Sequence, residues 1–155
     1  MTTAPARTYG FGTTVNLPYE QTIERTRAAL KEQGFGVLTE IDVRKTIKEK
    51  LDAEFRPYVI LGACNPPLAL RALSADLGIG LLLPCSVIVY DNGDGSSTVE
   101  VMDPEAALSL VGGNAEIVAV AREAKARLRS VVDELATVRH SLPNTERPGA
   151  PSPSN

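Results

Sequence analysis

The chain is organised around Gly62-Ala63-Cys64-Asn65-Pro66-Pro67, which joins an apolar run, 58–61, to a helix-like segment, 68–77. Asn65 is a good N-cap residue and Pro66 suits the first position of a helix. Cys64 is therefore expected beside the unpaired amides and the positive end of a helix, where the pKa of a thiol tends to fall and anions tend to bind. We predict a functional site at this junction.

Length and composition set the class of protein. With 155 residues the chain can build one domain with a hydrophobic core and a short tail. A net charge of -3 lacks the excess of Lys and Arg that a broad nucleic-acid footprint needs. The absence of Trp, with only three Phe, also leaves few side chains to stack on bases. We expect no nucleic-acid partner.

Residues 1–8 contain no apolar segment of the kind found in a signal peptide. No run approaches the ~20 apolar residues of a membrane-spanning helix, so we expect no membrane partner. Two cysteines are too few for a disulfide scaffold, which agrees with a reducing compartment. We predict a cytoplasmic protein.

The hydrophobic pattern alternates between period two and a helical period along the chain. Asn92-Gly93 and Asp94-Gly95 are typical of a tight hairpin between the last two strands, because such pairs supply residues with positive φ. A proline inside a strand must lie at an edge, a start or a bulge, so the strand after Pro84 is expected to begin at Cys85. The predicted strands are 8–17, 35–41, 55–61, 85–90 and 97–102, and the predicted helices are 18–33, 43–51, 66–76, 104–111 and 115–138.

This order of elements predicts an α+β fold, with a mostly antiparallel sheet and helices on one face. Residues 1–7 are expected to be frayed, and residues 8–138 to form the single domain. Residues 139–155 are rich in Pro and Ser and have no periodicity, which predicts a disordered tail.

Three motifs stand in a characteristic order: Gly62-Ala63-Cys64-Asn65-Pro66, then Leu83-Pro84-Cys85 before a β-branched run, then Met102-Asp103-Pro104 after a Gly-containing hairpin. Together with Gly34-Phe35 at the end of the first helix, they resemble the bacterial and archaeal family called domain of unknown function 302, over about residues 9–135. The resemblance implies a single-copy, two-layer β-α-β4-α fold like that of the TATA-binding protein, with short inserted helices. It implies a homodimer, and it carries neither DNA binding nor an established activity.

Cys64 and Cys85 are the candidate reactive or metal-ligating residues. If the middle strands form an antiparallel meander, as the resemblance implies, both cysteines lie at the same end of the sheet. Thiols whose Cα atoms are within about 7 Å could form a disulfide or share a soft metal ion. Both residues could equally be small apolar fillers, because free Cys is among the most buried residue types.

The remaining metal donors are few. A structural metal site usually has four Cys or His ligands, and the one histidine, His140, falls in the predicted tail. A metal would therefore need a site shared by two chains, a ligand such as Met102, or a haem. A single His also leaves no base for a Ser or Cys nucleophile, and Asp103 before Pro104 is a helix cap, so we expect no ordinary enzyme constellation.

Three functional interpretations follow. The first is a binding or sensing module that holds a small ligand, metal or cofactor at Cys64-Asn65-Pro66. The second is a thiol-redox protein in which Cys64 and Cys85 cycle between oxidation states. The third is a purely structural homodimer without a site.

Overall fold

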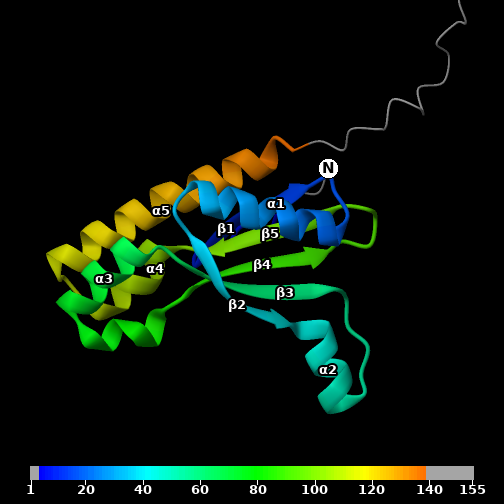
Figure 1. The fold of residues 1–155 in the computed structure, drawn as a ribbon, viewed down its shortest axis with the longest axis horizontal. Coiled ribbons are helices and arrows are strands. Elements are labelled where there is room, and N and C mark those ends of the chain that lie inside the picture. The colour runs from blue at the N-terminus through cyan, green and yellow to red at the C-terminus, as the bar shows by residue number, and fades with distance from the viewer. Residues whose placement is uncertain (1–3, 139–155) are drawn as a thin grey trace, which may run out of the picture.

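The computed structural model describes residues 4–138, which form two layers (Figure 1). One layer is a five-stranded antiparallel sheet in the order β1-β5-β4-β3-β2. The long helices α1 and α5 cover one face of it. The predicted α+β class and the β-α-β4-α order are confirmed.

The elements are β1 (Gly10–Val15), α1 (Tyr19–Glu32), β2 (Gly36–Asp42), α2 (Val43–Leu51), β3 (Tyr58–Cys64), α3 (Pro66–Ala75), the 3-10 helix η1 (Leu77–Leu82), β4 (Cys85–Asp91), β5 (Ser97–Met102), α4 (Pro104–Leu108), the 3-10 helix η2 (Ser109–Val111) and α5 (Ala115–Ala136).

The core lies between the sheet and the long helices. Every second residue of the central strands points into it, as the period of two requires. The apolar stripe of α5 is buried from Ile117 to Leu135, where the helix packs against β1, β5 and the helices α1, α3 and α4. The fully buried members of this core include Val59, Leu61, Val87, Val89, Val99, Val101, Ile117, Leu128, Val131 and Leu135.

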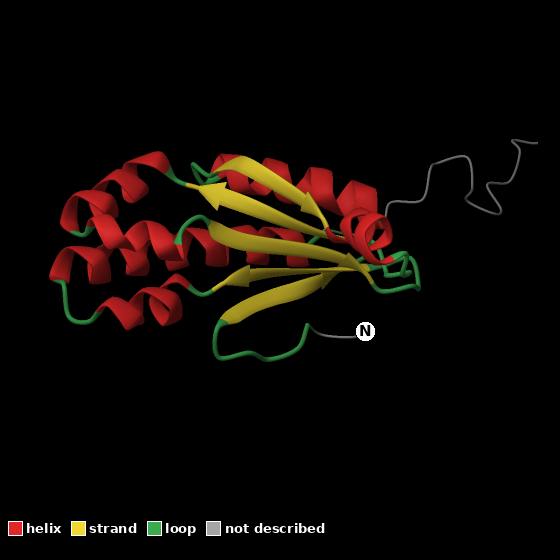
Figure 2. Ribbon diagram, turned by 90° about the horizontal axis from the view of Figure 1, so that it is seen from below, coloured by secondary structure: helices red, strands yellow, loops and turns green. Residues whose placement is uncertain are grey.

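In the described part of the chain the opposite face of the sheet has only the short helix α2 beside it, at the end of β2 and the start of β3, and the rest of this face carries no helix, as Figures 1 and 2 show. On this face the rings of Tyr58 and Tyr90 stack, with centroids 5.6 Å apart and planes 10° apart. Phe55 precedes β3 beside them, and its ring centroid lies 6.1 Å from that of Tyr58. Ile41 on the edge strand β2 is also exposed. This face of the sheet therefore carries aromatic and apolar side chains.

The hairpin between β4 and β5 is confirmed, but its turn is wider than predicted. Asp91 pairs with Ser97, so residues 92–96 form the loop. Gly93 and Gly95 have φ angles of 81° and 88°, whereas Asn92 keeps a negative φ. The Asn92 side chain instead crosses the loop, where Nδ2 donates to Ser96 Oγ at 2.9 Å and Oδ1 accepts from Thr98 Oγ1 at 2.9 Å.

Strand β3 runs from Tyr58 to Cys64, and the predicted range of 55–61 is wrong at both ends. Pro57 has no N–H to donate to the sheet, which agrees with a later start. Ladder pairs of Ala63 with Cys85 and of Gly36 with Cys64 extend the strand at its other end. Cys64 is therefore the last residue of a strand rather than part of the turn after it.

At the N-terminus, residues 4–9 precede β1 without regular secondary structure, and Arg7 forms an ion pair with Glu100 on β5. This part of the segment that was expected to be frayed thus contacts the sheet. The predicted disordered tail, 139–155, and His140 lie outside the described residues. Between residues 4 and 138, no helix is both long and apolar enough to cross a bilayer.

Candidate functional site

The junction between β3 and α3 has the capped geometry that the sequence predicts. Asn65 is buried, and its Oδ1 accepts a hydrogen bond from the N–H of Leu68 at 3.3 Å. Its Nδ2 donates to the carbonyl of Gln33 at 3.4 Å, which ties the start of α3 to the end of α1. Pro66 occupies the first turn of α3 and is exposed to solvent. Asn65 is therefore an anchor for this end of the fold.

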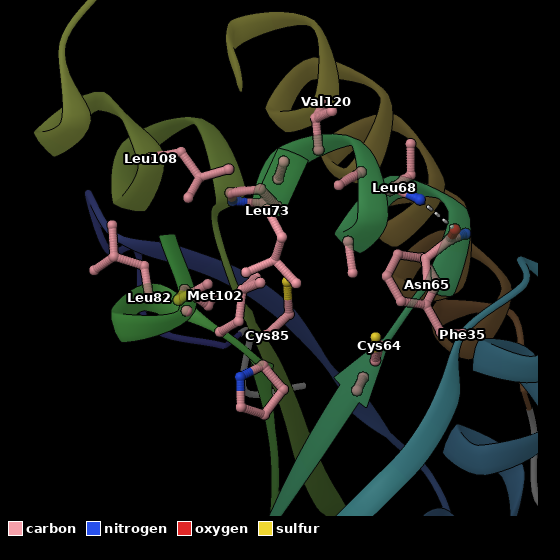
Figure 3. Close-up of a pocket in the computed structure, with 18 of the residues that line it drawn as sticks. Phe35, Cys64, Asn65, Leu68, Leu73, Leu82, Cys85, Met102, Leu108 and Val120 are labelled. Carbon is pink, nitrogen blue, oxygen red and sulfur yellow. Dashed lines mark hydrogen bonds between the residues drawn. The ribbon is translucent and has the colours of Figure 1, made fainter. Parts of the chain in front are cut away.

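A cavity of about 350 Å³ opens beside this junction, where the ends of β3 and β4 meet α3, η1 and α4 (Figure 3). Thr39 and Asn65 are its polar side chains, and no charged residue within 4–138 lines it. Three sulfur atoms, from Cys64, Cys85 and Met102, belong to the lining. The apolar lining includes Phe35, Ala63, Leu68, Ala69, Ala72, Leu73, Leu82, Leu83, Leu108, Val120 and Ala124.

The sequence of α3 explains why space remains there. Ala69 and Ala72 lie on the side of the helix that faces the cavity, and their methyl groups are too short to fill it. Leu70 lies on the outer side and is 67% exposed. The small residues thus leave a gap between α3 and the end of the sheet, and the larger Leu68 and Leu73 form its margins.

Cys64 and Cys85 are neighbours across β3 and β4, because Cys85 pairs with Ala63, the residue before Cys64. Both are free thiols and both line the cavity. Burial raises the pKa of Cys64. Burial, and then the nearby Cys64, raise the pKa of Cys85 to about 11. Both thiols are therefore neutral at pH 7, and the lowered pKa expected beside a helix N-terminus is not found, because desolvation dominates.

The structure brings together three of the four predicted site residues, Cys64, Asn65 and Cys85, in one cavity. Pro66 shapes the start of α3 but does not line the cavity. The apolar wall from α3, η1 and α4 was missed. The periodic Leu and Ala residues of 68–77 are its sequence signal, but the same pattern is typical of a filled core.

The side chains that line the cavity determine whether it could hold a metal ion. Cys64, Cys85 and Met102 are the sulfur donors of the cavity. Among residues 4–138 no group of three or more Cys, His, Asp or Glu residues is placed to hold a metal ion. A four-ligand structural site would therefore need donors from outside the described residues.

The fold and the cavity define a small α+β domain with one antiparallel sheet and an apolar pocket at the sheet end. Comparison with known proteins identifies its family. A family profile described as "Domain of unknown function DUF302" matches residues 11–135, and the chain belongs to this family. A crystal structure of an uncharacterized conserved DUF302 protein from Bacillus stearothermophilus is similar, with 30% sequence identity and a TM-score of 0.75. The match covers 83% of this chain and 99% of that one. A comparison with curated protein sequences finds no match.

Proposed function

We propose that this protein is a binding module that holds a small, uncharged, apolar molecule in the cavity between α3, η1 and the ends of β3 and β4. The observation that carries the proposal is the cavity of about 350 Å³ with its hydrocarbon and sulfur lining. Ligand pockets of proteins start at roughly 300 Å³. A dry apolar cavity of about 150 Å³ is enough to bind benzene, so this one has room for a molecule about twice that size.

The chemistry of the lining favours a neutral ligand. Cys64 and Cys85 have raised pKa values, so they bring no negative charge into the cavity at pH 7. Transfer of an ion into such surroundings without a partner is costly. Thioether and thiol groups are polarizable and make favourable contacts with aromatic rings, and Met102 and the two thiols supply such groups on one side. An aromatic or polyene hydrocarbon therefore fits better than a sugar, a phosphate or an amino acid.

A fluorescence titration tests the proposal. N-phenyl-1-naphthylamine is an uncharged probe whose emission rises in apolar surroundings, and we expect saturable binding of one molecule per chain. The variant Ala69→Phe places a ring inside the cavity and should weaken binding at least tenfold. The matched control Leu70→Phe places the same ring on the outer side of the same helix and should bind as the wild type does. Equal binding by both variants would locate the probe elsewhere and contradict the proposal.

A second candidate function rests on the two neighbouring thiols. Cys64 and Cys85 lie at adjacent positions of paired strands and share one cavity, which supports a dithiol that closes to a disulfide by exchange with an external disulfide, which takes up the two hydrogens and is reduced to two thiols. Mass spectrometry of the intact protein with and without reductant measures the loss of these two hydrogens. A mass that does not change between the two conditions contradicts the redox function and leaves the binding function untouched.

We also propose that the chain forms a homodimer. Strand β2 is an edge of the sheet, and the side chains of Leu38 and Ile41 on it are 67% and 49% exposed. Uncovered edges with exposed apolar side chains favour pairing with another chain. Light scattering should give twice the monomer mass for the wild type and the monomer mass for Ile41→Lys. A monomer mass for the wild type at micromolar concentration contradicts the homodimer.

A further inference from the structure

Glu100 is a buried carboxylate on the face of the sheet opposite α1 and α5. It lies on β5 opposite Gly12 of β1, and its side chain is 4% exposed. A Cβ atom built on Gly12 would lie 2.8 Å from Glu100 Cγ, so the glycine provides the space that this side chain occupies. A buried carboxylate destabilises a fold unless a cation and hydrogen bonds compensate it. Glu100 therefore requires a partner.

The partner in this structure is a guanidinium from the chain itself. Arg7 Nε donates to Glu100 Oε1 at 2.6 Å, and Nη2 donates to Oε2 at 3.3 Å. This is the two-pronged pairing in which a guanidinium matches a carboxylate. The Tyr90 hydroxyl lies 3.4 Å from Glu100 Oε2, and the Arg7 guanidinium lies 5.9 Å from the centre of the Tyr9 ring. The cation is thus paired with a carboxylate and lies near the face of one aromatic ring.

The arm that carries Arg7 is only partly embedded. Residues 4–9 have no regular secondary structure, and the Arg7 side chain remains 34% exposed. Two hollows of about 210 Å³ and about 280 Å³ flank the ion pair, and Arg7, Ile88 and Glu100 line both of them. Arg7 thus separates two parts of one groove. Tyr9 and Met102 belong to one side, and Tyr58 and Tyr90 to the other.

We propose that Glu100 and the tyrosines around it form a binding site for an alkylguanidinium, and that Arg7 is a built-in occupant that an external guanidinium displaces. The external group is an arginine side chain of a polypeptide or a free guanidino compound. The carboxylate supplies charge and two acceptors in one plane, and the rings supply faces that attract a planar cation. The groove lies on the opposite face of the sheet from α1 and α5 and shares only Met102 with the lining of the apolar cavity, so the proposal does not depend on the function proposed for that cavity.

Tyrosine fluorescence of the protein can detect binding at this site. It has no Trp, and three of its four tyrosines, Tyr9, Tyr58 and Tyr90, line the two hollows. We expect butylguanidinium to change the tyrosine emission of Arg7→Ala in a saturable way in the millimolar range. The wild type should bind about twofold more weakly or worse, because tethered Arg7 competes at an effective concentration in the same millimolar range as the affinity of the free ligand. Neutral butylurea, which has the same shape, should not bind.

Two controls separate this site from other cation contacts. The double variant Arg7→Ala/Glu100→Gln should lose the response to butylguanidinium. Arg56→Ala removes a guanidinium that lies over the Tyr90 ring, 5.9 Å from its centre, but leaves Glu100 occupied, so it should gain no binding. Should Arg7→Ala fold poorly, Arg7→Gln keeps a neutral donor for Glu100 and serves in the same titration.

A short arginine-containing peptide distinguishes the two sources of the ligand. Binding of this peptide to Arg7→Ala at least tenfold more tightly than butylguanidinium assigns the groove to a polypeptide partner. Equal affinity assigns it to a free guanidino compound. If neither ligand gives a saturable response with Arg7→Ala or Arg7→Gln, the ion pair only fastens the N-terminal arm and the proposal is overturned.

Discussion

Leu68→Ala should destabilise the fold less than Leu128→Ala, although both variants remove the same atoms from buried helical positions. Leu68 is 5% exposed and lies in the wall of the cavity. Leu128 is fully buried in α5 and does not line it. Leu→Ala in a closed core costs about 3–5 kcal/mol, because the remaining void has lost its contacts. One side of Leu68 already faces empty space, so we expect a cost near 2–3 kcal/mol.

Urea unfolding measures this difference. With a slope of about 1.5–2 kcal/mol per molar urea for a domain of this size, a gap of about 1.5 kcal/mol separates the two midpoints by roughly 0.8 M. The comparison is valid if the free energy of unfolding falls with urea concentration at the same slope in both variants. If Leu68→Ala costs as much as Leu128→Ala, or more, then Leu68 is packed on all sides in solution. The cavity would then not exist there, and the reasoning would be refuted.

Three further predictions test other parts of the structure. Asn65→Ala removes a helix cap and should cost about 1–2 kcal/mol in urea unfolding, and a change below a few tenths would contradict its anchoring role. Gly12→Ala should cost about 1–3 kcal/mol, because its Cβ would lie 2.1 Å from the carbonyl oxygen of Val99, whereas Gly36→Ala meets nothing within 4 Å and should be nearly neutral. Burial raises the pKa of Cys85 from 9.0 to about 11. The neutral thiol therefore adds its full share to the free energy of unfolding below pH 9, and this share is lost as pH rises through 11. Relative to Cys85→Ala, the wild type should lose roughly 2 kcal/mol across that range, and parallel pH profiles would contradict the burial of this thiol.

Local sequence patterns were sufficient to predict most of the helices and strands. The caps at Asn65 and Asp103 are where the sequence predicts them, because a capping side chain binds amides only two or three residues away. The hairpin at 92–96 and the buried stripe of α5 are equally local patterns. The width of the turn was missed because Asn92 closes the loop through both its backbone N–H, which donates to the Ser96 carbonyl at 3.1 Å, and its side chain, which bonds to Ser96 and Thr98.

The candidate sites depend on contacts that no local pattern encodes. The ion pair between Arg7 and Glu100 joins residues 93 positions apart, and neither residue stands in a motif. The cavity depends on how far α3 lies from the sheet end, which side chain volumes across several elements determine. The adjacency of Cys64 and Cys85 followed from the meander that the family resemblance implies, whereas their raised pKa values depend on a depth of burial that sequence does not show.

The location of a bound apolar molecule tests the central claim most directly. Isotope-filtered NMR on protein with labelled methyl groups detects contacts between the protons of N-phenyl-1-naphthylamine and individual side chains. We predict contacts to the methyl groups of Leu68, Leu82 and Leu108, which line the cavity from α3, η1 and α4. Contacts confined to Ile41 and Ile88, on the face of the sheet opposite α1 and α5, would contradict the claim that the cavity is the binding site.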